Sequence, residues 1–417
     1  MPMLPVADAE AIILDAVQPL DPSFDRELVP LLDCSGRILA DSIASSLDFP
    51  HWDNSAMDGY AVRFDEVEQA SPETPIALTI VEEIPAGAIP QNALQPGQTA
   101  RILTGSMMPA GADTVVMQER VQRNGDRIEI LQAPPEVGHF VRHQGSFYRA
   151  GDRLLQSGLK IRGAELAVLA AAQCLQVPVY RRVKVGVLST GSELVQPHET
   201  LQPGQIVDSN QFALVALLKQ SGMDAIALGT VKDDRASLQQ AMKAAIESCD
   251  VVISSGGVSV GDYDYVEELL GKLGGELRVR SIAIKPGKPL TFATFGTKLY
   301  FGLPGNPVSA LVTFWRFVLP ALEKRSGQLG DGGPHWTTAI AIDRLTSDGK
   351  RESYLWGRLE IAPQESTQTY PRFQLAAGSG SSGNLVNLAG SNALAVLPVG
   401  VQAIEPGTPI TVLQIPD

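Results

Sequence analysis

Three short segments rich in glycine, serine and proline are the parts of the sequence most able to bind an anion. They read STGSE at 189–193, SSGGVSVGD at 254–262 and LPGNPVSA at 303–310. Each comes after an apolar run typical of a buried strand and before a run with helical periodicity. In a doubly wound sheet, ligands bind beyond the carboxyl ends of such strands, where backbone N–H groups and helix N-termini favour negative charge. Ordinary tight turns are the alternative, but three such segments together predict one phosphate-binding cleft.

Two lysines lie close together in the segment IAIKPGKPL. Lys285 and Lys288 flank a Pro-Gly turn, after an apolar run that we expect to be a strand of the same sheet. Two ammonium groups at such a place suit an oxyanion or a phosphate. A solvated turn is the alternative interpretation.

Carboxylates gather in the same part of the sequence. The candidates are Glu193, Asp208, Asp233, Asp234, Asp262 and Asp264. Carboxylate oxygens are ligands that Mg²⁺ prefers, and a phosphate beside the ion commonly completes its coordination. Asp208 and Asp264 could instead be N-caps of the helices that follow them.

The middle segment also contains Gly257-Val258-Ser259-Val260-Gly261, a match to the G-x-S-x-G elbow of serine hydrolases. In the α/β-hydrolases an acid and then a histidine follow the serine along the chain. The only histidine after Ser259 is His335, which lies beside a glycine-rich stretch. A serine hydrolase is therefore a weak alternative. The sequence also lacks a P-loop and a G-x-G-x-x-G after a strand, which disfavours common ATPase and dinucleotide sites.

Composition excludes several other classes of protein. The chain has 417 residues with a formal charge of −13, so nucleic acid is not an expected partner. Its three cysteines form no C-x-x-C, and its five histidines show no metal-ligand spacing, so a zinc site is not expected. We see neither a signal peptide nor a run of about 18 apolar residues, and expect a cytoplasmic protein without a membrane span.

The order of apolar runs predicts several domains. Short β-type runs from about 75 to 132 indicate a small antiparallel domain. Strands alternate with helices over 181–329, which predicts a doubly wound, mostly parallel sheet. The last helix of this region is expected to be one long helix that starts at Asn306-Pro307. A second small β domain is expected over 330–417.

Several longer strings occur in an order that resembles one family. They are DNSAMDGYAVR (53–63), RILTGSMMPAGADTVVMQE (101–119), GVLSTGSEL (186–194), SSGGVSVGDYDYV (254–266), IAIKPGKPL (282–290) and GLPGNPVSA (302–310). The chain resembles the molybdopterin molybdenumtransferases, the MoeA family, which includes the E domain of gephyrin. The similarity extends over most of the chain and is more specific than any single motif.

The resemblance implies a multidomain fold with a central doubly wound α/β domain that binds molybdopterin and smaller β-rich domains. The N-terminal domain would be segmented, from 1–48 and 150–180, with a β domain inserted at 49–149. The α/β domain would span 181–329 and the last β domain 330–417. The resemblance also implies a homodimer and a molybdopterin adenylyltransferase as pathway partner. The implied reaction inserts molybdate into adenylylated molybdopterin and releases AMP, with Mg²⁺ assisting.

Site residues follow from the resemblance. The pocket for the nucleotide and phosphates would be lined by Thr190, Gly191, Gly256, Gly257, Ser259, Gly305 and Asn306. The metal candidates are Glu193, Asp233 and Asp264. The catalytic candidates are Lys285, Lys288, Asp58 and Thr104. The last two would come from other domains and face the cleft from the partner subunit.

The sequence departs from the family pattern at two places. An acidic pair common after Arg142 is replaced by Ser146 and Phe147, and adjacent serines expected near 386–387 are replaced by Val386 and Asn387. The molybdate subsite is therefore less well defined than the nucleotide pocket. A paralogue that binds molybdopterin without inserting metal, or that acts as a scaffold, is the main alternative.

Overall fold

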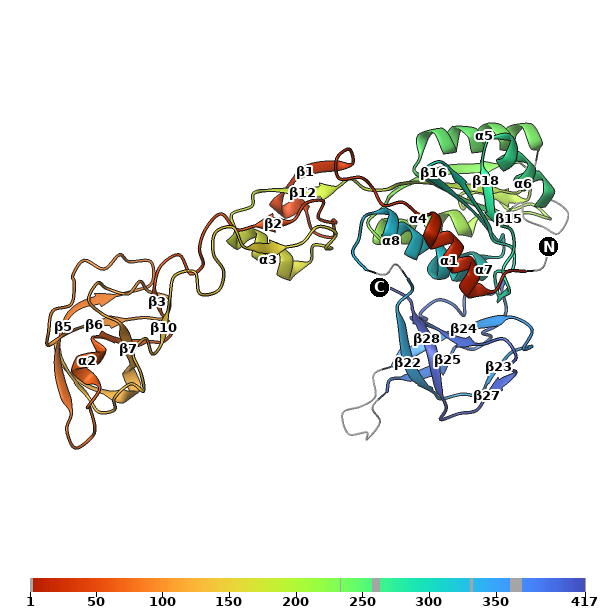
Figure 1. Cartoon of the computed structure of the whole chain (residues 1–417). Coiled ribbons are helices and arrows are strands. Elements are labelled where there is room, and N and C mark those ends of the chain that lie inside the picture. The colour runs from red at the N-terminus through yellow and green to blue at the C-terminus, as the bar shows by residue number, and fades with distance from the viewer. Residues whose placement is uncertain (1–2, 233, 257–262, 331–332, 361–369, 417) are drawn as a thin grey trace. The chain divides into compact units, whose positions relative to one another are not determined.

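The computed structural model describes residues 3–232, 234–256, 263–330, 333–360 and 370–416 (Figure 1). The chain forms two compact units. Unit 1 comprises Met1–Asp41, Ser157–Leu166 and Gln176–Asp417, and unit 2 comprises Ser42–Gln156 and Ala167–Leu175. Among the described helices, none is both long and apolar enough to cross a membrane.

The larger sheet of unit 1 is the predicted doubly wound sheet. Its strand order is β16 (Asp224–Val231), β13 (Lys184–Thr190), β17 (Val251–Gly256), β21 (Lys298–Leu303), β20 (Thr291–Phe295) and β18 (Glu276–Val279). The first four strands run parallel, and the last two are antiparallel to their neighbours. The expected mostly parallel α/β sheet is confirmed, although the sequence analysis missed β20.

Helices cover both faces of this sheet (Figure 1). One face carries α5 (Arg235–Ser248) and α6 (Tyr263–Lys272), and the other carries α1 (Val6–Ala16), α4 (Ser209–Gln220), α7 (Pro307–Thr313) and α8 (Leu319–Arg325). Side chains of a strand alternate between the two faces, so Val252 joins one core while its neighbours Val251 and Ile253 join the other. This burial on both faces explains the apolar runs within the central strands, such as VGVL in β13 and VVI in β17.

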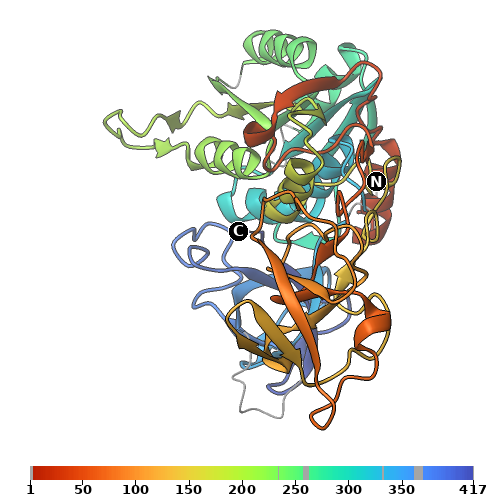
Figure 2. The ribbon, with the colours of Figure 1, turned by 90° about the vertical axis from the view of Figure 1, so that its left-hand side faces the viewer.

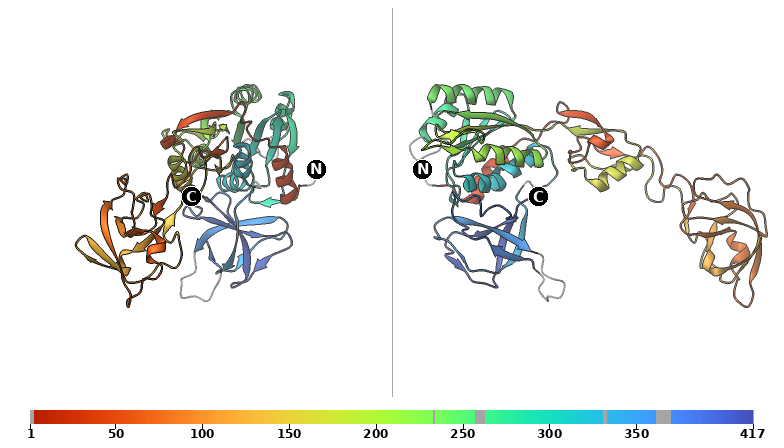
Figure 3. Two further views of the ribbon diagram at one scale, coloured as in Figure 1. Left: turned by 60° about the vertical axis from the view of Figure 1, so that its left-hand side comes forward. Right: turned by 180° about the vertical axis from the view of Figure 1, so that it is seen from behind.

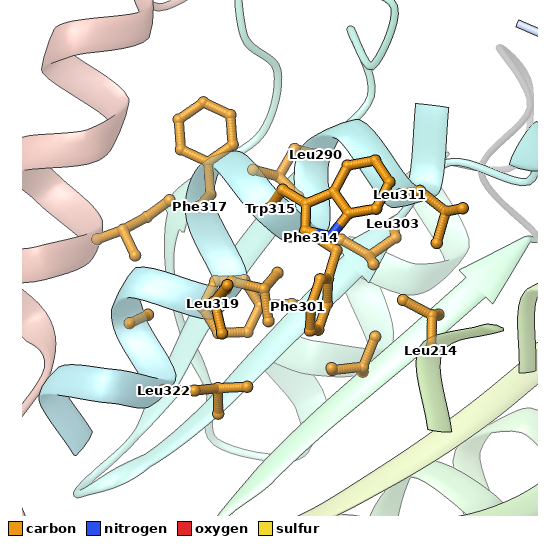
Figure 4. Packing of buried hydrophobic residues seen from close by; sticks show 14 of the residues in the cluster. Leu214, Leu290, Phe301, Leu303, Leu311, Phe314, Trp315, Phe317, Leu319 and Leu322 are labelled. Carbon is orange, nitrogen blue, oxygen red and sulfur yellow. The ribbon is translucent and has the colours of Figure 1, made fainter. Parts of the chain in front are cut away.

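The predicted long helix after Asn306 is interrupted. A π-helical turn, Phe314–Val318, separates α7 from α8. Pro320 follows this turn, and proline can neither donate a backbone hydrogen bond nor leave room for the carbonyl four residues earlier, so the regular α-helical pattern breaks there. The turn still packs in the core, where Phe314 and Leu319 lie with Phe301 of β21 (Figure 4).

A second sheet forms the C-terminal part of unit 1 (Figure 3, blue). Its order is β19 (Ile284–Lys285), β24 (Glu352–Glu360), β25 (Arg372–Leu375), β22 (Trp336–Ala341), β28 (Pro409–Gln414) and β26 (Ala393–Leu397), and β26 also pairs with β24. The last five strands therefore close into a small barrel. Two further short strands from the same part of the chain, β23 (Leu345–Thr346) and β27 (Ala403–Ile404), form an antiparallel pair.

The placement of β19 corrects one prediction. Lys285 was expected to follow a strand of the doubly wound sheet, but Ile284 and Lys285 pair in parallel with Glu352 and Ser353 of the C-terminal sheet. An apolar run shows that a strand is buried, and it does not show which sheet supplies the neighbouring strand. The two-lysine turn is therefore attached to the C-terminal barrel.

The rest of unit 1 consists of small elements. An antiparallel ribbon joins β1 (Arg26–Pro30) to β12 (Gln176–Tyr180), and a short helical turn at Leu31–Asp33 follows β1. The segment with β14 (Leu194–Val195) and β15 (Ile206–Val207) projects from the α/β layers (Figure 2).

Unit 2 is built around a sheet of mixed direction. The order is β7 (Thr114–Met117), β4 (Gly59–Val62), β6 (Gln98–Ile102), β5 (Ile76–Ile84), β9 (Arg127–Ile130) and β8 (Val121–Asn124). The β5–β6 pair is parallel, so the prediction of an antiparallel domain is wrong for this pair. Smaller elements are β2 (Ile43–Ala44), β3 (Asn54–Ser55), α2 (Phe64–Val67), η2 (Gln118–Arg120), β10 (Val141–Arg142) and β11 (Arg153–Leu155). Helix α3 (Gly163–Ala171) carries the chain from unit 1 into unit 2. The division into four domains stays a prediction.

A buried ion pair connects distant parts of unit 1. Arg316 of the π-helical turn donates two hydrogen bonds to the carboxylate of Glu10 in α1, at 2.6 and 2.7 Å. Its Nε also donates to the hydroxyl of Tyr354 in β24, at 2.9 Å. The guanidinium is 5% exposed, so its charge depends on these partners rather than on water.

We predict that Glu10→Ala lowers the free energy of unfolding by about 3 kcal/mol, because it leaves a buried guanidinium without its carboxylate. Urea unfolding followed by tryptophan fluorescence measures this change. The matched control is Glu405→Ala, which breaks an exposed pair with Arg344 and should change stability by less than about 1 kcal/mol. Equal losses in the two variants would contradict the prediction.

Candidate functional site

A cavity of about 700 Å³ opens in unit 1 at the carboxyl ends of β13, β17 and β21. Parallel strands in adjacent positions bring the loops that follow them to the same edge of the sheet. The lining residues are Thr190, Glu193, Leu194, Ile206, Val207, Asp208, Ser209, Asn210, Ser255, Gly256, Pro289, Pro304, Gly305, Asn306, Pro307, Ser309, Gly383 and Leu385. Its volume falls within the usual range for small-molecule sites.

Four of the predicted nucleotide and phosphate residues line this cavity. They are Thr190, Gly256, Gly305 and Asn306, one or two from each of the three loops. Gly191 follows Thr190 and is buried, and a Cβ at this position would lie 2.8 Å from Oε2 of Glu193. Gly257 and Ser259 lie outside the described residues.

Glycine is required where the loops touch each other. Gly256 has a φ of +89°, and a Cβ on it would lie 2.2 Å from the carbonyl oxygen of Thr190. A Cβ on Gly305 would lie 3.4 Å from Cα of Gly256, so the third loop approaches the second backbone to backbone. The three loops therefore form one tight edge made largely of main chain.

The cavity lining includes Thr190, whose buried hydroxyl group has no hydrogen-bond partner among the described residues. Thr190 is 2% exposed, and within the described parts of the chain its Oγ1 has no hydrogen-bond partner. A buried hydroxyl without a partner loses the free energy of a hydrogen bond, which a bound ligand can restore.

The acidic candidates divide into two groups. Asp208 caps α4 by accepting from the backbone N–H of Gln211 at 3.1 Å, and Asp234 caps α5 by accepting from that of Ser237 at 2.9 Å. Hydrogen bonds from Ser237 lower the pKa of Asp234. The N-cap interpretation of Asp208 is thereby supported, and both carboxylates are committed to helix ends.

Of the three proposed metal ligands, Glu193 is exposed and lines the cavity. Asp233 lies outside the described residues, and of Asp264 only its place in the first turn of α6 is described. Within the described ranges, no three histidine, cysteine or acidic side chains gather as a metal site would require.

The turn that contains Lys285 and Lys288 directly precedes Pro289, which lines the cavity. Lys285 donates from Nζ to Oδ2 of Asp348 at 3.0 Å. The backbone N–H of Lys350 and the Lys285 ammonium lower the pKa of Asp348. Lys288 is exposed, and its carbonyl accepts from the N–H of Ile282 at 3.0 Å, which closes the turn. Neither lysine belongs to the lining.

Asp58 and Thr104 come together in unit 2 although 46 positions separate them. The backbone N–H and the hydroxyl of Thr104 both donate to Oδ1 of Asp58, each at 2.7 Å. The Thr104 hydroxyl, and then its N–H, lower the pKa of Asp58. Asp58 is therefore an exposed, ionised carboxylate held in one orientation.

Several residues of the cavity were not among the predicted site residues. Asn210 and Ser255 supply buried polar groups, and Gly383 and Leu385 come from a Gly/Ser loop of the C-terminal region. Ser382 of that loop accepts from the side chain of Asn306 at 3.2 Å. Asn210 follows a predicted N-cap at the strand-end edge of the sheet, which was the available signal for it, whereas nothing in the sequence indicated where the Gly/Ser loop would lie.

We predict that Thr104→Val raises the pKa of Asp58, because the variant loses the hydroxyl donor and keeps only the backbone N–H. A ¹³C NMR titration of the side-chain carboxyl measures this pKa. Because the folded-state pKa is lowered, the contribution of Asp58 to stability is present above its ordinary pKa and is lost as pH falls through the lowered value. Thr104→Ser keeps a hydroxyl and should retain the lowered pKa; identical titrations of the two variants would refute the assignment.

We predict that Gly256→Ala collapses the loop edge, because a Cβ there meets the Thr190 carbonyl. The expected loss of unfolding free energy is more than about 2 kcal/mol, measured by urea denaturation. Gly204→Ala is the control, since Gly204 has a φ of +87° but nothing within 4 Å of its Cβ position. It should lose only about 1 kcal/mol from backbone strain. If both variants lose the same, backbone contact is not what requires glycine at 256.

Comparison with known proteins now identifies the family. Three family profiles match in order: the MoeA N-terminal region (domain I and II) over residues 4–172, a probable molybdopterin binding domain over 186–324, and the MoeA C-terminal region (domain IV) over 338–415. The molybdopterin molybdenumtransferase of Nostoc sp. is 51% identical, over 100% of this chain and 94% of the relative. That of Haemophilus influenzae is 40% identical, over 76% of this chain and 78% of the relative.

A solved structure agrees with this result. The molybdopterin biosynthesis MoeA protein from Pyrococcus horikoshii OT3 is 30% identical, with a TM-score of 0.84 over 99% of this chain and 100% of the other. With its fold matched over the whole length and a relative half identical to it from end to end, the chain belongs to the molybdopterin molybdenumtransferase (MoeA) family.

Proposed function

We propose that this chain inserts molybdate into adenylylated molybdopterin and releases AMP, which leaves the pterin dithiolene carrying molybdenum. The observation that carries this proposal is the cavity of about 700 Å³ at the strand ends, where three glycine-containing loops meet over a buried, unpartnered hydroxyl within the described residues. The family assignment supplies the reaction. A cavity of this size and lining supports the proposal that a nucleotide with phosphates binds there.

Two kinds of group line the cavity. Backbone at Gly256 and Gly305, with the hydroxyl of Thr190, offers small polar groups to phosphate oxygens. The lining also includes the apolar side chains of Leu194, Ile206 and Leu385. A planar ring such as adenine or the pterin would bury its faces against apolar side chains of this kind while the phosphates meet the loops.

Lys285 and Lys288 are the proposed partners of the molybdate oxyanion. The Lys285–Asp348 pair is 40% and 35% exposed, so solvent screens the attraction between the two charges and an incoming dianion can replace Asp348. During insertion two Mo–S bonds form and the phosphoanhydride bond breaks. The oxygen that molybdate loses attacks the adenylate phosphorus, either directly or as water formed with the two thiol protons, so AMP leaves with this oxygen and the pterin keeps its own phosphate. Fixed cations would stabilise the charge on these oxygens.

The metal proposal rests on Glu193, Asp233 and Asp264. All three are carboxylates, a donor set that fits Mg²⁺, and Glu193 already lines the cavity. A bound Mg²⁺ would polarise the phosphoanhydride and neutralise part of its charge. Asp208 and Asp234 are not proposed as ligands, since each caps a helix.

Other parts of the proposal concern the assembly and the pathway. Asp58, held by Thr104, would act as a fixed ionised group that faces the substrate from the partner subunit of a homodimer. A molybdopterin adenylyltransferase would supply the adenylylated substrate. The protein would work in the cytoplasm.

The decisive experiment mixes the protein with adenylylated molybdopterin, Mg²⁺ and molybdate. We expect molybdate-dependent release of AMP, measured by chromatography, together with formation of molybdenum cofactor. Tight pterin binding without AMP release would instead support the non-catalytic paralogue.

The same assay tests the catalytic candidates. We predict that Asp58→Ala and Lys288→Ala lower the rate of cofactor formation by at least about 100-fold while the fold is retained, because each removes a fixed charge from the reacting groups. Asp126→Ala and Lys243→Ala remove exposed charges of the same sign elsewhere and should keep the wild-type rate. A wild-type rate in Asp58→Ala or Lys288→Ala would remove that residue from the mechanism.

A further inference from the structure

Asn210 holds two of the cavity loops together from a third element. It lies in the first turn of α4 and is 8% exposed. Its side-chain Nδ2 donates to Oγ of Ser255, at the end of β17, at 2.7 Å. The same nitrogen donates to the carbonyl oxygen of Gly305, in the loop after β21, at 2.8 Å. All three residues line the cavity.

The orientation of the amide follows from its partners. The Gly305 carbonyl can only accept a hydrogen bond, so the nitrogen of the amide must face it. Both amide hydrogens are then used, one on each loop. Asn210 therefore has no donor left for a ligand and acts on the site through the loops.

The bond to Gly305 orients a peptide group. Among the described residues, the cis peptides are Phe49-Pro50 and Lys285-Pro286, so the peptide from Gly305 to Asn306 is trans. In a trans peptide the C=O and the N–H point in opposite directions. When the Gly305 carbonyl is directed to Asn210, the N–H of Asn306 is turned away from it. The hydroxyl of Ser255 directs the Pro304 carbonyl in the same way, by a longer bond of 3.4 Å.

This arrangement matters for an anion. Carbonyl oxygens repel phosphate oxygens, whereas N–H groups bind them. Gly305 lacks a side chain and is exposed, so its peptide groups could otherwise rotate and present a carbonyl to the cavity. A fixed carbonyl prevents that rotation.

We propose that Asn210 is a positioning residue that withdraws the Gly305 carbonyl, so that the loop presents N–H groups to the phosphate of the adenylate. The inference rests on the proposed function, since it takes adenylylated molybdopterin as the ligand. Helix α4 would therefore take part in phosphate recognition, because its Asn210 fixes the orientation of a peptide group in a glycine-containing loop.

The experiment measures AMP binding by isothermal titration calorimetry. Asn210→Ala should raise the Kd of AMP by at least about tenfold, because the loop no longer holds its donors toward the phosphate. Asn210→Asp has the same shape but no N–H, so it should weaken AMP binding at least as much while it keeps the packing.

Gln211→Ala is the matched control. Gln211 is also buried on α4 and donates from Nε2 to the Gly229 carbonyl at 2.9 Å, but it does not line the cavity. Both alanine variants should lose thermal stability to a similar degree, and only Asn210→Ala should lose AMP affinity. For the full reaction, Asn210→Ala should raise the KM for adenylylated molybdopterin about tenfold with kcat changed less than threefold.

Three results would overturn the inference: wild-type AMP affinity in both Asn210 variants, an equal loss of affinity in Gln211→Ala, or no AMP binding by the wild-type protein. Failure of the proposed function looks different, since AMP would bind with the predicted dependence on Asn210 while molybdate-dependent AMP release is absent.

Discussion

Backbone contact between the three loops is the constraint on which the rest of the site depends. Adjacent parallel strands lie about 4.8 Å apart, so the loops that leave them have little room for side chains. The place of Gly256 against the Thr190 carbonyl is the clearest example. Once the main chain occupies this edge, its own polar groups are the ones a ligand meets. Further side chains that line the cavity come from α4, from the β14–β15 segment and from the C-terminal region.

The C-terminal barrel is therefore part of the site rather than an appendage. It supplies the strand partner of Ile284 and Lys285, the carboxylate that pairs with Lys285, and the loop that contacts Asn306. The side chain of Arg351, which directly precedes β24, also donates to the carbonyl of Ile284 at 3.2 Å. Lys285 is thus held by main-chain pairing, and under the proposed function its flexible end would exchange Asp348 for an oxyanion.

Much of the fold could be predicted because apolar runs and loop composition are local signals. The alternation of β13, α4, β16, α5 and β17 follows from buried strands and helical periodicity, and the Gly- and Ser-rich strand ends identified the edge where the cavity lies. Other features depend on partners far along the chain. Nothing local to Ile284 shows that its neighbour is Glu352, and nothing local to Asn210 shows that Gly305 receives its hydrogen bond. The interruption of the last helix could have been predicted from a local signal, since Pro320 lies within the expected helix.

The packing of α1 against parts of the chain that come much later, to which the Glu10–Arg316 pair also belongs, has a consequence for folding during translation. Helix α1 is synthesised before the other described elements, yet the core that buries its Val6 and Ile13 also contains residues as late as Leu413. Residues 42–156, which lie between these parts in the chain, belong to the other unit and can fold as soon as they appear. We therefore expect the apolar face of α1 to stay exposed to solvent until the later parts of its core have been synthesised. An exposed apolar segment of this kind is a binding site for chaperones.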